Sequence, residues 1–153
     1  EIWEVQDTIL TYFQHMSEKV AARLRKHHYK ASHFYIGLKT DQGWLQSKAK
    51  LSHSIDDGHA LFTQCRRFTM QNWQGEPVWQ VQVTALNPQE QQQADLFEDT
   101  DQNKQREKLN STIDKINQRY GEFTVSPLRL IDRSEMPNVI APSWKPTGHR
   151  KTI

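Results

Sequence analysis

Apolar residues near the start of the chain recur at the spacing of an amphipathic helix. From about Glu4 to His27 they follow one another at intervals of three and four, so they share one helical face. A second helix is predicted from about Asp56 to Trp73, where acidic residues favour a helix N-terminus and apolar residues again follow at helical spacing. The apolar positions of the first helix are Ile9, Phe13, Met16, Val20 and Leu24.

Three other segments alternate between apolar and polar residues with a period of two, which is the pattern of a strand with one buried face. They span residues 33–39, 44–52 and 78–86. Residues 41–43, Asp-Gln-Gly, supply a turn, so the first two strands are predicted to form a hairpin. The side chains expected to face the core are Phe34, Ile36, Leu38, Leu45, Ala49, Leu51, Trp79, Val81, Val83 and Ala85.

The order helix, strand, strand, helix, strand predicts an α+β fold in which an antiparallel sheet carries both helices on one face. The other face, called the open face below, is left to solvent or to a partner. Its lysines would neutralise phosphate charge, and its amides and hydroxyls would donate hydrogen bonds to phosphate oxygens. Any solvated sheet face is polar as well, so ordinary exposure remains the alternative. The residues expected on the open face, one aromatic and no carboxylate among them, are His33, Tyr35, Lys39, Gln46, Lys48, Lys50, Gln80, Gln82 and Thr84.

The net charge of +2 hides an uneven distribution of basic and acidic residues. Residues 19–50 contain eight lysines and arginines and one acid, whereas residues 87–101 contain five acids and no base. This segregation favours a polyanionic partner for the first stretch and disfavours phosphate contact for the second. The hydrophobic content of 35% is low for a fully packed globule of 153 residues, so one domain with a solvated tail is predicted.

A single cysteine, Cys65, excludes an intramolecular disulfide framework and a zinc ribbon, so a reducing cytoplasm is the expected compartment. Because Cys65 lies on an apolar stripe, it is expected to pack in the core. No apolar run approaches the ~20 residues that span a bilayer, and no signal peptide opens the chain, so no membrane partner is expected. The sequence begins inside an amphipathic pattern without an initiator Met and is expected to be a piece of a longer polypeptide.

The last part of the chain is predicted to be a linker at residues 88–101, which follows a domain at residues 1–87 and precedes an extension at residues 102–153. Leu96 and Phe97 have no core of their own in this linker, so their burial requires another molecule. Each would contribute roughly 1.5 to 3 kcal/mol on full burial, offset by the ordering of the linker. The extension starts with a short amphipathic helix and ends in an irregular, Pro-rich stretch. The apolar stripe of that helix comprises Leu109, Ile113, Ile116 and Tyr120.

The segment 93–97, Gln-Ala-Asp-Leu-Phe, resembles the peptide that binds the bacterial sliding clamp. That peptide has a Gln, two further residues and then Leu-Phe, often with Asp before the Leu. The resemblance implies that Gln93, Asp95, Leu96 and Phe97 bind the clamp.

Nearly the whole chain, in turn, is similar to the little finger domain of Y-family translesion DNA polymerases. The similarity rests on the helix ending Ala-Ala-Arg-Leu-Arg at 21–25, the strand Phe-Tyr-Ile-Gly-Leu-Lys-Thr at 34–40, the order of the other elements and the clamp peptide. The extension looks like the tail of the branch that includes the catalytic subunit of DNA polymerase V. A DNA polymerase IV-like chain is the alternative branch.

This resemblance implies a role in error-prone DNA synthesis during DNA repair and the SOS response. The little finger would lie along the backbone of double-stranded template-primer DNA, and the clamp peptide would keep the polymerase near the primer end. The parent chain would be a DNA-directed DNA polymerase in the nucleoid-associated cytoplasm, with Mg²⁺ held by palm acids that this fragment lacks. No catalytic residue, metal or cofactor is therefore expected here, and other SOS mutagenesis subunits are expected as further partners.

Two other functions fit the same pattern. An RNA-binding module also has an open sheet face, but it usually displays two or three aromatics for base stacking, whereas the predicted open face has Tyr35 alone. Tyr35 itself is expected either to stack on a base or to pack against a cross-strand neighbour. A protein-interaction scaffold would instead insert Leu96 and Phe97 into some other groove.

Metal chemistry is disfavoured by residue spacing. His27, His28 and His33 include adjacent residues at a helix end, which do not converge easily on one ion. Asp56 and Asp57 are neighbours that would diverge on a helix, so interaction with the helix dipole is favoured over two-metal phosphoryl transfer.

Overall fold

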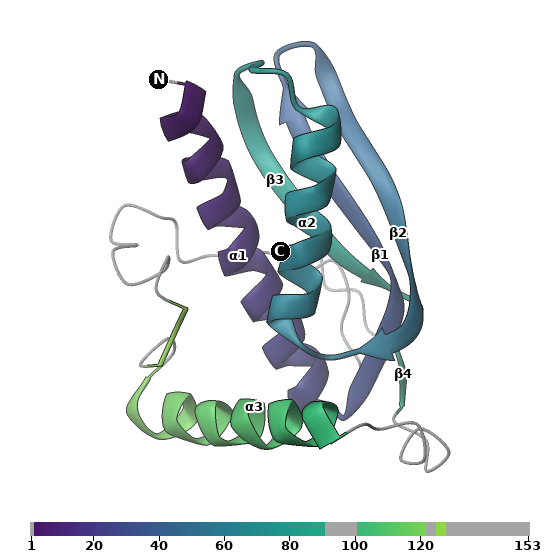
Figure 1. Cartoon of the computed structure of the whole chain (residues 1–153), viewed down its shortest axis with the longest axis vertical. Coiled ribbons are helices and arrows are strands. Elements are labelled where there is room, and N and C mark those ends of the chain that lie inside the picture. The colour runs from purple at the N-terminus through teal and green to yellow at the C-terminus, as the bar shows by residue number, and fades with distance from the viewer. Residues whose placement is uncertain (1, 91–100, 122–124, 128–153) are drawn as a thin grey trace, which may run out of the picture.

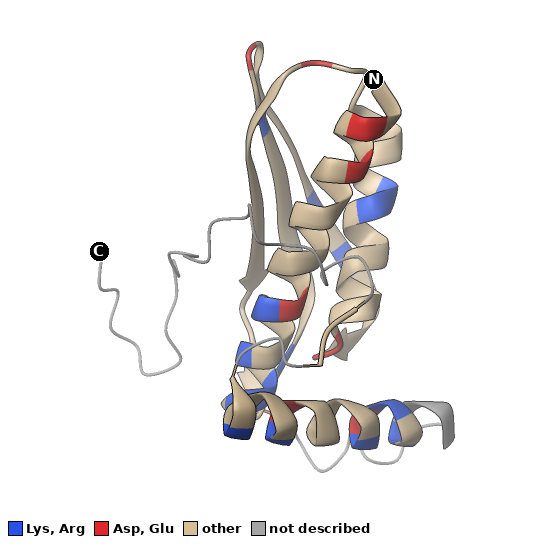
Figure 2. Cartoon of the chain, turned by 90° about the vertical axis from the view of Figure 1, so that its left-hand side faces the viewer, with Lys and Arg blue, Asp and Glu red and all other residues tan. Residues whose placement is uncertain are grey.

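The computed structural model describes residues 2–90, 101–121 and 125–127. In that part of the chain two helices cover one face of an antiparallel sheet, and a further helix crosses the end of these two layers (Figures 1 and 2). The predicted α+β class, with two helices on one face of the sheet, is confirmed. None of the described helices is both long and apolar enough to cross a membrane. In chain order the elements are α1 Ile2–Lys26, β1 Tyr29–Thr40, β2 Gly43–Ile55, α2 Gly58–Asn72, β3 Val78–Leu86, β4 Gln89–Glu90 and α3 Asp101–Tyr120.

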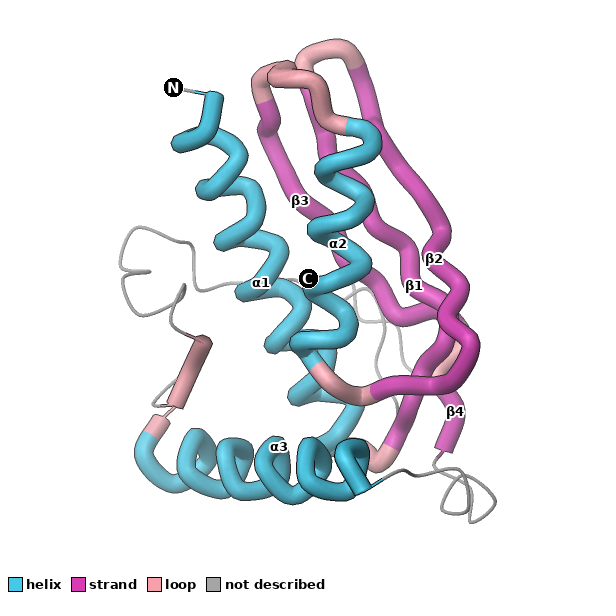
Figure 3. The backbone as a smooth tube through the Cα atoms, viewed as in Figure 1, coloured by secondary structure: helices cyan, strands magenta, loops and turns pink. Residues whose placement is uncertain are grey.

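The central strand of the sheet is β1, because the strand order is β2-β1-β3 with antiparallel pairing (Figure 3). The turn between β1 and β2 has Gly43 at a φ of 112°, a left-handed conformation that glycine adopts without steric cost. The hydroxyl of Thr40 braces this turn, since it accepts from the backbone N–H of Gln42 and donates to the carbonyl of Gly43. The predicted hairpin is therefore confirmed. The short strand β4 pairs with the opposite end of β1, at Tyr29 and Lys30.

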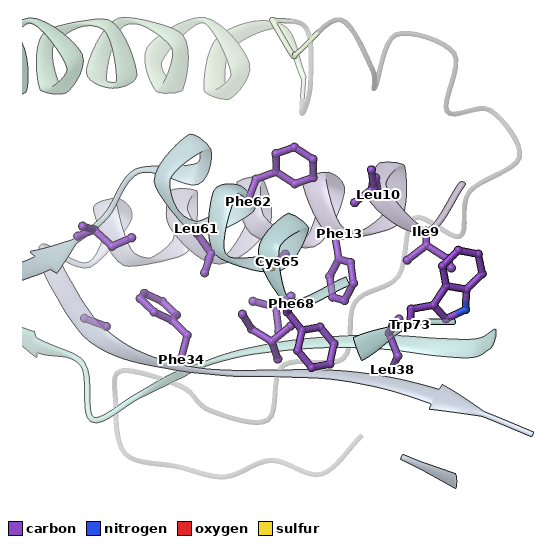
Figure 4. Close-up of a cluster of buried hydrophobic side chains, with 14 of the residues drawn as sticks. Ile9, Leu10, Phe13, Phe34, Leu38, Leu61, Phe62, Cys65, Phe68 and Trp73 are labelled. Atoms are coloured by element: carbon purple, nitrogen blue, oxygen red, sulfur yellow. The ribbon is translucent and has the colours of Figure 1, made fainter. Parts of the chain in front are cut away.

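The core lies between the sheet and the apolar faces of α1 and α2 (Figure 4). Phe13 of α1 and Phe34 of β1 are fully buried, and the rings of Phe13 and Phe68 meet edge to face with centroids 6.4 Å apart. Cys65 of α2 is fully buried in the same cluster, as predicted, and burial raises the pKa of its thiol to about 12. Because these contacts are predominantly apolar, removal of hydrophobic area from water stabilises them.

Alternation along the strands predicted the core side chains correctly except at Trp79. This side chain is 73% exposed, so its predicted burial is wrong. The cause is a register shift: β1 pairs Lys39 with Gln80 and Thr40 with Val78, which leaves Trp79 as an extra residue in β3. A bulge of this kind re-aims the side chain that it carries.

The helix α3 lies across the end of the domain where α1 stops and α2 begins (Figure 1), and polar side chains dock it there. Arg25 of α1 donates two hydrogen bonds to the carboxylate of Asp114, of 2.7 Å and 2.8 Å, and a third to the backbone carbonyl of Asp56. Lys30 of β1 pairs with Glu107 at 3.0 Å. The contact is therefore a set of ion pairs and hydrogen bonds.

The predicted helix in the extension is confirmed, but its apolar stripe is not its main docking face. Ile113 and Ile116 are half-buried, whereas Leu109 and Tyr120 are exposed. Among the side chains of this helix that the structure describes, at residues 104–120, the buried one is Asn110, whose amide donates to Asp57 at the start of α2.

Candidate nucleic-acid interface

The strand register brings all nine residues predicted for the open face to one side of the sheet. Figure 2 shows α1 and α2 on the opposite side of the sheet. Residues paired across antiparallel strands point to the same face, so each row contains one residue from β2, one from β1 and one from β3. From the hairpin turn towards β4 the rows are Trp44–Lys39–Gln80, Gln46–Gly37–Gln82, Lys48–Tyr35–Thr84 and Lys50–His33–Leu86.

These four rows carry three lysines and no carboxylate. Lys39, Lys48 and Lys50 are all exposed, and His33 beside Lys50 is exposed as well. Lys48 and Lys50 are two residues apart on β2, so their side chains leave the same face roughly 7 Å apart along the strand. The open face is therefore a cationic surface, which is the kind of surface that attracts a polyanion.

Hydrogen bonds fix some of the polar side chains between the lysines. The hydroxyl of Tyr35 donates to the side-chain oxygen of Gln46 at 2.6 Å, and the amide of Gln82 donates to the hydroxyl of Thr84 at 3.4 Å. The cross-strand bond of Tyr35 fits the expectation that this residue contacts a neighbouring strand. It also fixes the tip of the ring at the centre of the face.

The sequence interpretation missed one aromatic residue of the open face. Trp44 lies opposite Lys39 and is 41% exposed. The same alternation that placed Gln46 and Lys48 on this face also places Trp44 there, so the signal was present in the sequence. The expectation that Tyr35 is the lone aromatic is therefore wrong.

The basic stretch 19–50 does not form one phosphate-facing surface. Arg25 and Lys30 point to α3, where they pair with Asp114 and Glu107. Burial alone would lower the pKa of Arg25, but the Asp114 carboxylate outweighs this effect and the pKa is raised. These two cations neutralise acids of the same chain. The lysines of the open face are Lys39, Lys48 and Lys50.

Asp57 caps α2, which accounts for one of the two acidic residues predicted at this helix start. Its carboxylate accepts from the backbone N–H of Ala60 at 3.1 Å and also from Arg106 and Asn110 of α3. Burial would raise the pKa of Asp57, but the hydrogen bonds from Asn110 and Arg106 outweigh it, so the pKa lies below its ordinary value. The pKa of the neighbouring Asp56 is raised by burial. Within the described ranges, no group of three or more His, Cys, Asp or Glu side chains is placed to hold a metal ion.

The predicted clamp-binding residues Gln93, Asp95, Leu96 and Phe97 lie outside the described residues. The described elements on either side are β4, which ends at Glu90, and α3, which begins at Asp101. Since β4 pairs with β1 and α3 docks on α1, both flanks of this segment are attached to the same end of the domain (Figure 1).

Comparison with known proteins agrees with this architecture. The model of the impB/mucB/samB family C-terminal domain matches residues 4–96, a range that includes the sheet, α1 beyond its first residues, and α2, and that ends before α3. No curated protein and no solved structure matches the chain. The chain thus belongs to the impB/mucB/samB family, and residues 4–96 are its C-terminal domain, the little finger of Y-family DNA polymerases.

Proposed function

We propose that the open face of this little finger binds the sugar-phosphate backbone of double-stranded template-primer DNA. The observation that carries the proposal is the register of β2, β1 and β3, which gathers Lys39, Lys48 and Lys50 on one face without a carboxylate in its four rows. Backbone contacts of this kind are largely independent of base sequence, which suits a polymerase that moves along its template.

Two features support this proposal over an ordinary solvated face. Exposed surfaces normally mix both signs of charge, whereas the four rows of the open face carry lysines and no acid. The acids nearest in sequence lie outside these rows: Asp41 is in the hairpin turn, and Asp56 and Asp57 follow β2. The glutamines and Thr84 between the lysines also supply the uncharged donors that contact phosphate oxygens in protein–DNA interfaces.

Titration of the chain with a short duplex at several salt concentrations tests this proposal. We expect affinity to fall steeply with salt, because phosphate contacts release condensed counterions. The double change Lys48→Ala and Lys50→Ala should weaken binding and reduce the slope of log affinity against log salt by about 2. The matched control is Lys104→Ala with Lys108→Ala, which removes the same charge from exposed positions of α3.

Two results would contradict the proposal. One is duplex binding that does not depend on salt, or no duplex binding at all. The other is an equal loss of affinity in both double variants, because that would show a response to net charge and not to the open face.

We also propose that residues 93–97 tether the polymerase to the sliding clamp. The support is the sequence Gln-Ala-Asp-Leu-Phe and its place between two elements, β4 and α3, that are attached to the domain. A tether raises the local concentration of the polymerase at the primer end to the millimolar range for short linkers, without any increase in DNA affinity.

The tether is tested with purified bacterial sliding clamp. We expect Leu96→Ala with Phe97→Ala to abolish clamp binding and to leave duplex affinity unchanged. Gln91→Ala with Gln92→Ala, in the same segment but before the peptide, is the control that should retain clamp binding. Parallel loss of clamp and duplex binding in the first variant would contradict the separation of the two roles.

For the full-length protein we propose DNA-directed DNA polymerase activity of the translesion type, in the cytoplasm and as part of the SOS response, with Mg²⁺ and the catalytic acids in another domain. Other SOS mutagenesis subunits are proposed as further partners. The support is membership in the impB/mucB/samB family. A primer-extension assay of the full-length protein across a lesion, with and without Mg²⁺, tests this assignment.

A further inference from the structure

One glycine on the open face is buried although its row has no helix above it. Gly37 lies at the centre of β1, opposite Gln46 of β2 and Gln82 of β3. An added Cβ at this position would lie 3.1 Å from the ring of Tyr35 and 3.3 Å from two ring atoms of Trp44. The two aromatic side chains therefore reach over the backbone of Gly37 from either side and cover it.

The absence of a side chain at Gly37 is what permits this arrangement. Distances of 3.1 and 3.3 Å to a Cβ are shorter than ordinary van der Waals contact, so any larger residue would push both rings away from the sheet. Tyr35 is held in place by its 2.6 Å hydrogen bond to Gln46, and Trp44 remains 41% exposed. These residues, Tyr35, Gly37 and Trp44, form what we call the aromatic shelf.

The surroundings of the aromatic shelf indicate its ligand. Lys39 is directly opposite Trp44, and Lys48 is directly opposite Tyr35, so each ring has a cation beside it. A ligand that contacts both the rings and the lysines must combine flat apolar rings with negative charge at regular intervals. Single-stranded nucleic acid has this combination, and base stacking on aromatic side chains within a cationic groove is a common way to bind it.

We propose that the aromatic shelf stacks an unpaired base of the DNA strand that extends beyond the duplex held by the lysines. This inference rests on the proposed duplex-binding function and adds a second ligand at the same face. Bases inside a duplex are already stacked on their neighbours, so the shelf engages a base only where the strand is unpaired. Trp44 and Gly37 lie in the two rows nearest the hairpin turn and Tyr35 lies in the third, whereas the row nearest β4 holds Lys50 and His33 and no shelf residue.

Three DNA hairpins test the proposal on the complete chain: one blunt, one with a short thymidine overhang, and one with an overhang of equal length made of abasic sugars. The abasic overhang has the same phosphate charge and no bases. We expect the thymidine overhang to bind at least about fivefold more tightly than the abasic one, which is the lower end of the effect of stacking one base. We expect Trp44→Ala to remove this difference and Trp44→Phe to retain part of it.

Trp79→Ala is the matched control, because Trp79 is also an exposed tryptophan but belongs to the bulge in β3 and not to the four rows. This variant should keep the full preference for the thymidine overhang. Equal affinity for the thymidine and abasic overhangs would overturn the proposal. So would an equal loss of the preference in Trp44→Ala and Trp79→Ala.

Failure of the aromatic shelf and failure of the duplex site give different results. If the blunt hairpin binds with a steep salt dependence but the thymidine overhang adds nothing, the shelf proposal is wrong and the duplex proposal stands. If Lys48→Ala with Lys50→Ala leaves the blunt hairpin unaffected, the duplex proposal is wrong, and the shelf proposal that rests on it is wrong as well.

Discussion

Two contacts hold the described elements together, and their chemistry is opposite. The contact of α1 and α2 with the sheet is predominantly apolar and includes fully buried residues such as Phe13 and Phe34. The contact of α3 with the domain is made by Arg25, Asp57 and their charged or amide partners. Hydrophobic contact resists salt, whereas partly exposed ion pairs are screened by it, so the two parts of the molecule should respond differently to the same change of solvent.

The largest effect is expected in the apolar contact. Phe13→Ala should lower the free energy of unfolding by about 3 to 5 kcal/mol, because it removes a fully buried ring and leaves a cavity beside Phe68. Chemical denaturation monitored by circular dichroism measures this loss. Trp79→Ala, an equally drastic truncation at an exposed site, should change the free energy by less than about 0.5 kcal/mol. Similar losses in both variants would contradict the assignment of the core.

A smaller and local effect is expected where α3 docks. Arg25→Ala removes two hydrogen bonds to Asp114, and charged hydrogen bonds contribute about 1.5 to 3 kcal/mol. Hydrogen exchange should show that the amides of α3 lose protection while those of β1 keep theirs, and added salt should reduce the difference from the wild type. Arg119→Ala, at the end of α3, is the control. Loss of protection in β1 as well would mean that α3 is part of the core.

Asp57 caps α2 and also contacts α3, so two substitutions separate its roles. Asp57→Ala removes the N-cap of α2 and should cost about 1 to 2 kcal/mol. Asp57→Asn keeps one oxygen that can cap the helix, but it loses the charge and the second acceptor oxygen, which receives hydrogen bonds from Arg106 and Asn110. Since the pKa of Asp57 is lowered in the folded state, its charge stabilises the protein above the ordinary carboxyl pKa, and this stability is lost as the pH falls through the lowered value. The difference between wild type and Asp57→Asn should therefore be largest at neutral pH and decrease as the pH falls through the lowered value.

The smallest expected effect is an increase in stability, from a substitution at Glu18. Burial raises the pKa of Glu18, despite the nearby charge of Arg25, and its carboxylate lies against Gly58 at the start of α2. A raised carboxyl pKa means that the folded state favours the protonated form, so the ionised form destabilises the protein at neutral pH. Glu18→Gln should therefore raise the melting temperature slightly at pH 7 and have no such benefit once the pH falls below the ordinary carboxyl pKa. Glu4→Gln, on the exposed side of α1, is the control; a lower melting temperature for Glu18→Gln at pH 7 would contradict this prediction.

The elements of the domain were predictable because each has one buried face with a regular period. The predicted strand 78–86 coincides with β3, and the open face followed from the same alternation. Trp79 was placed wrongly because a register shift interrupts the alternation, and no local residue pattern marks this shift. The docking of α3 was not predictable, since polar contacts such as Asn110 with Asp57 leave no hydrophobic period in the sequence.

The sequence predicts which face carries the residues of the aromatic shelf, but not that they meet. The period of two places Trp44 and Tyr35 on one face, but only the pairing of β1 with β2 shows that both reach over Gly37. Which residues lie diagonally across two strands depends on the hairpin register, and the register depends on the turn at Gly43.

The attachment of both flanks of residues 91–100 has a mechanical consequence for the proposed tether. A sliding clamp that pulled on these residues would load two anchors in parallel: the backbone pairing of β4 with Tyr29 and Lys30, and the ion pairs of α3 with Arg25 and Lys30. Only the second anchor softens as ionic strength rises. A rise in salt concentration would therefore shift tension from the α3 end towards the β4 end.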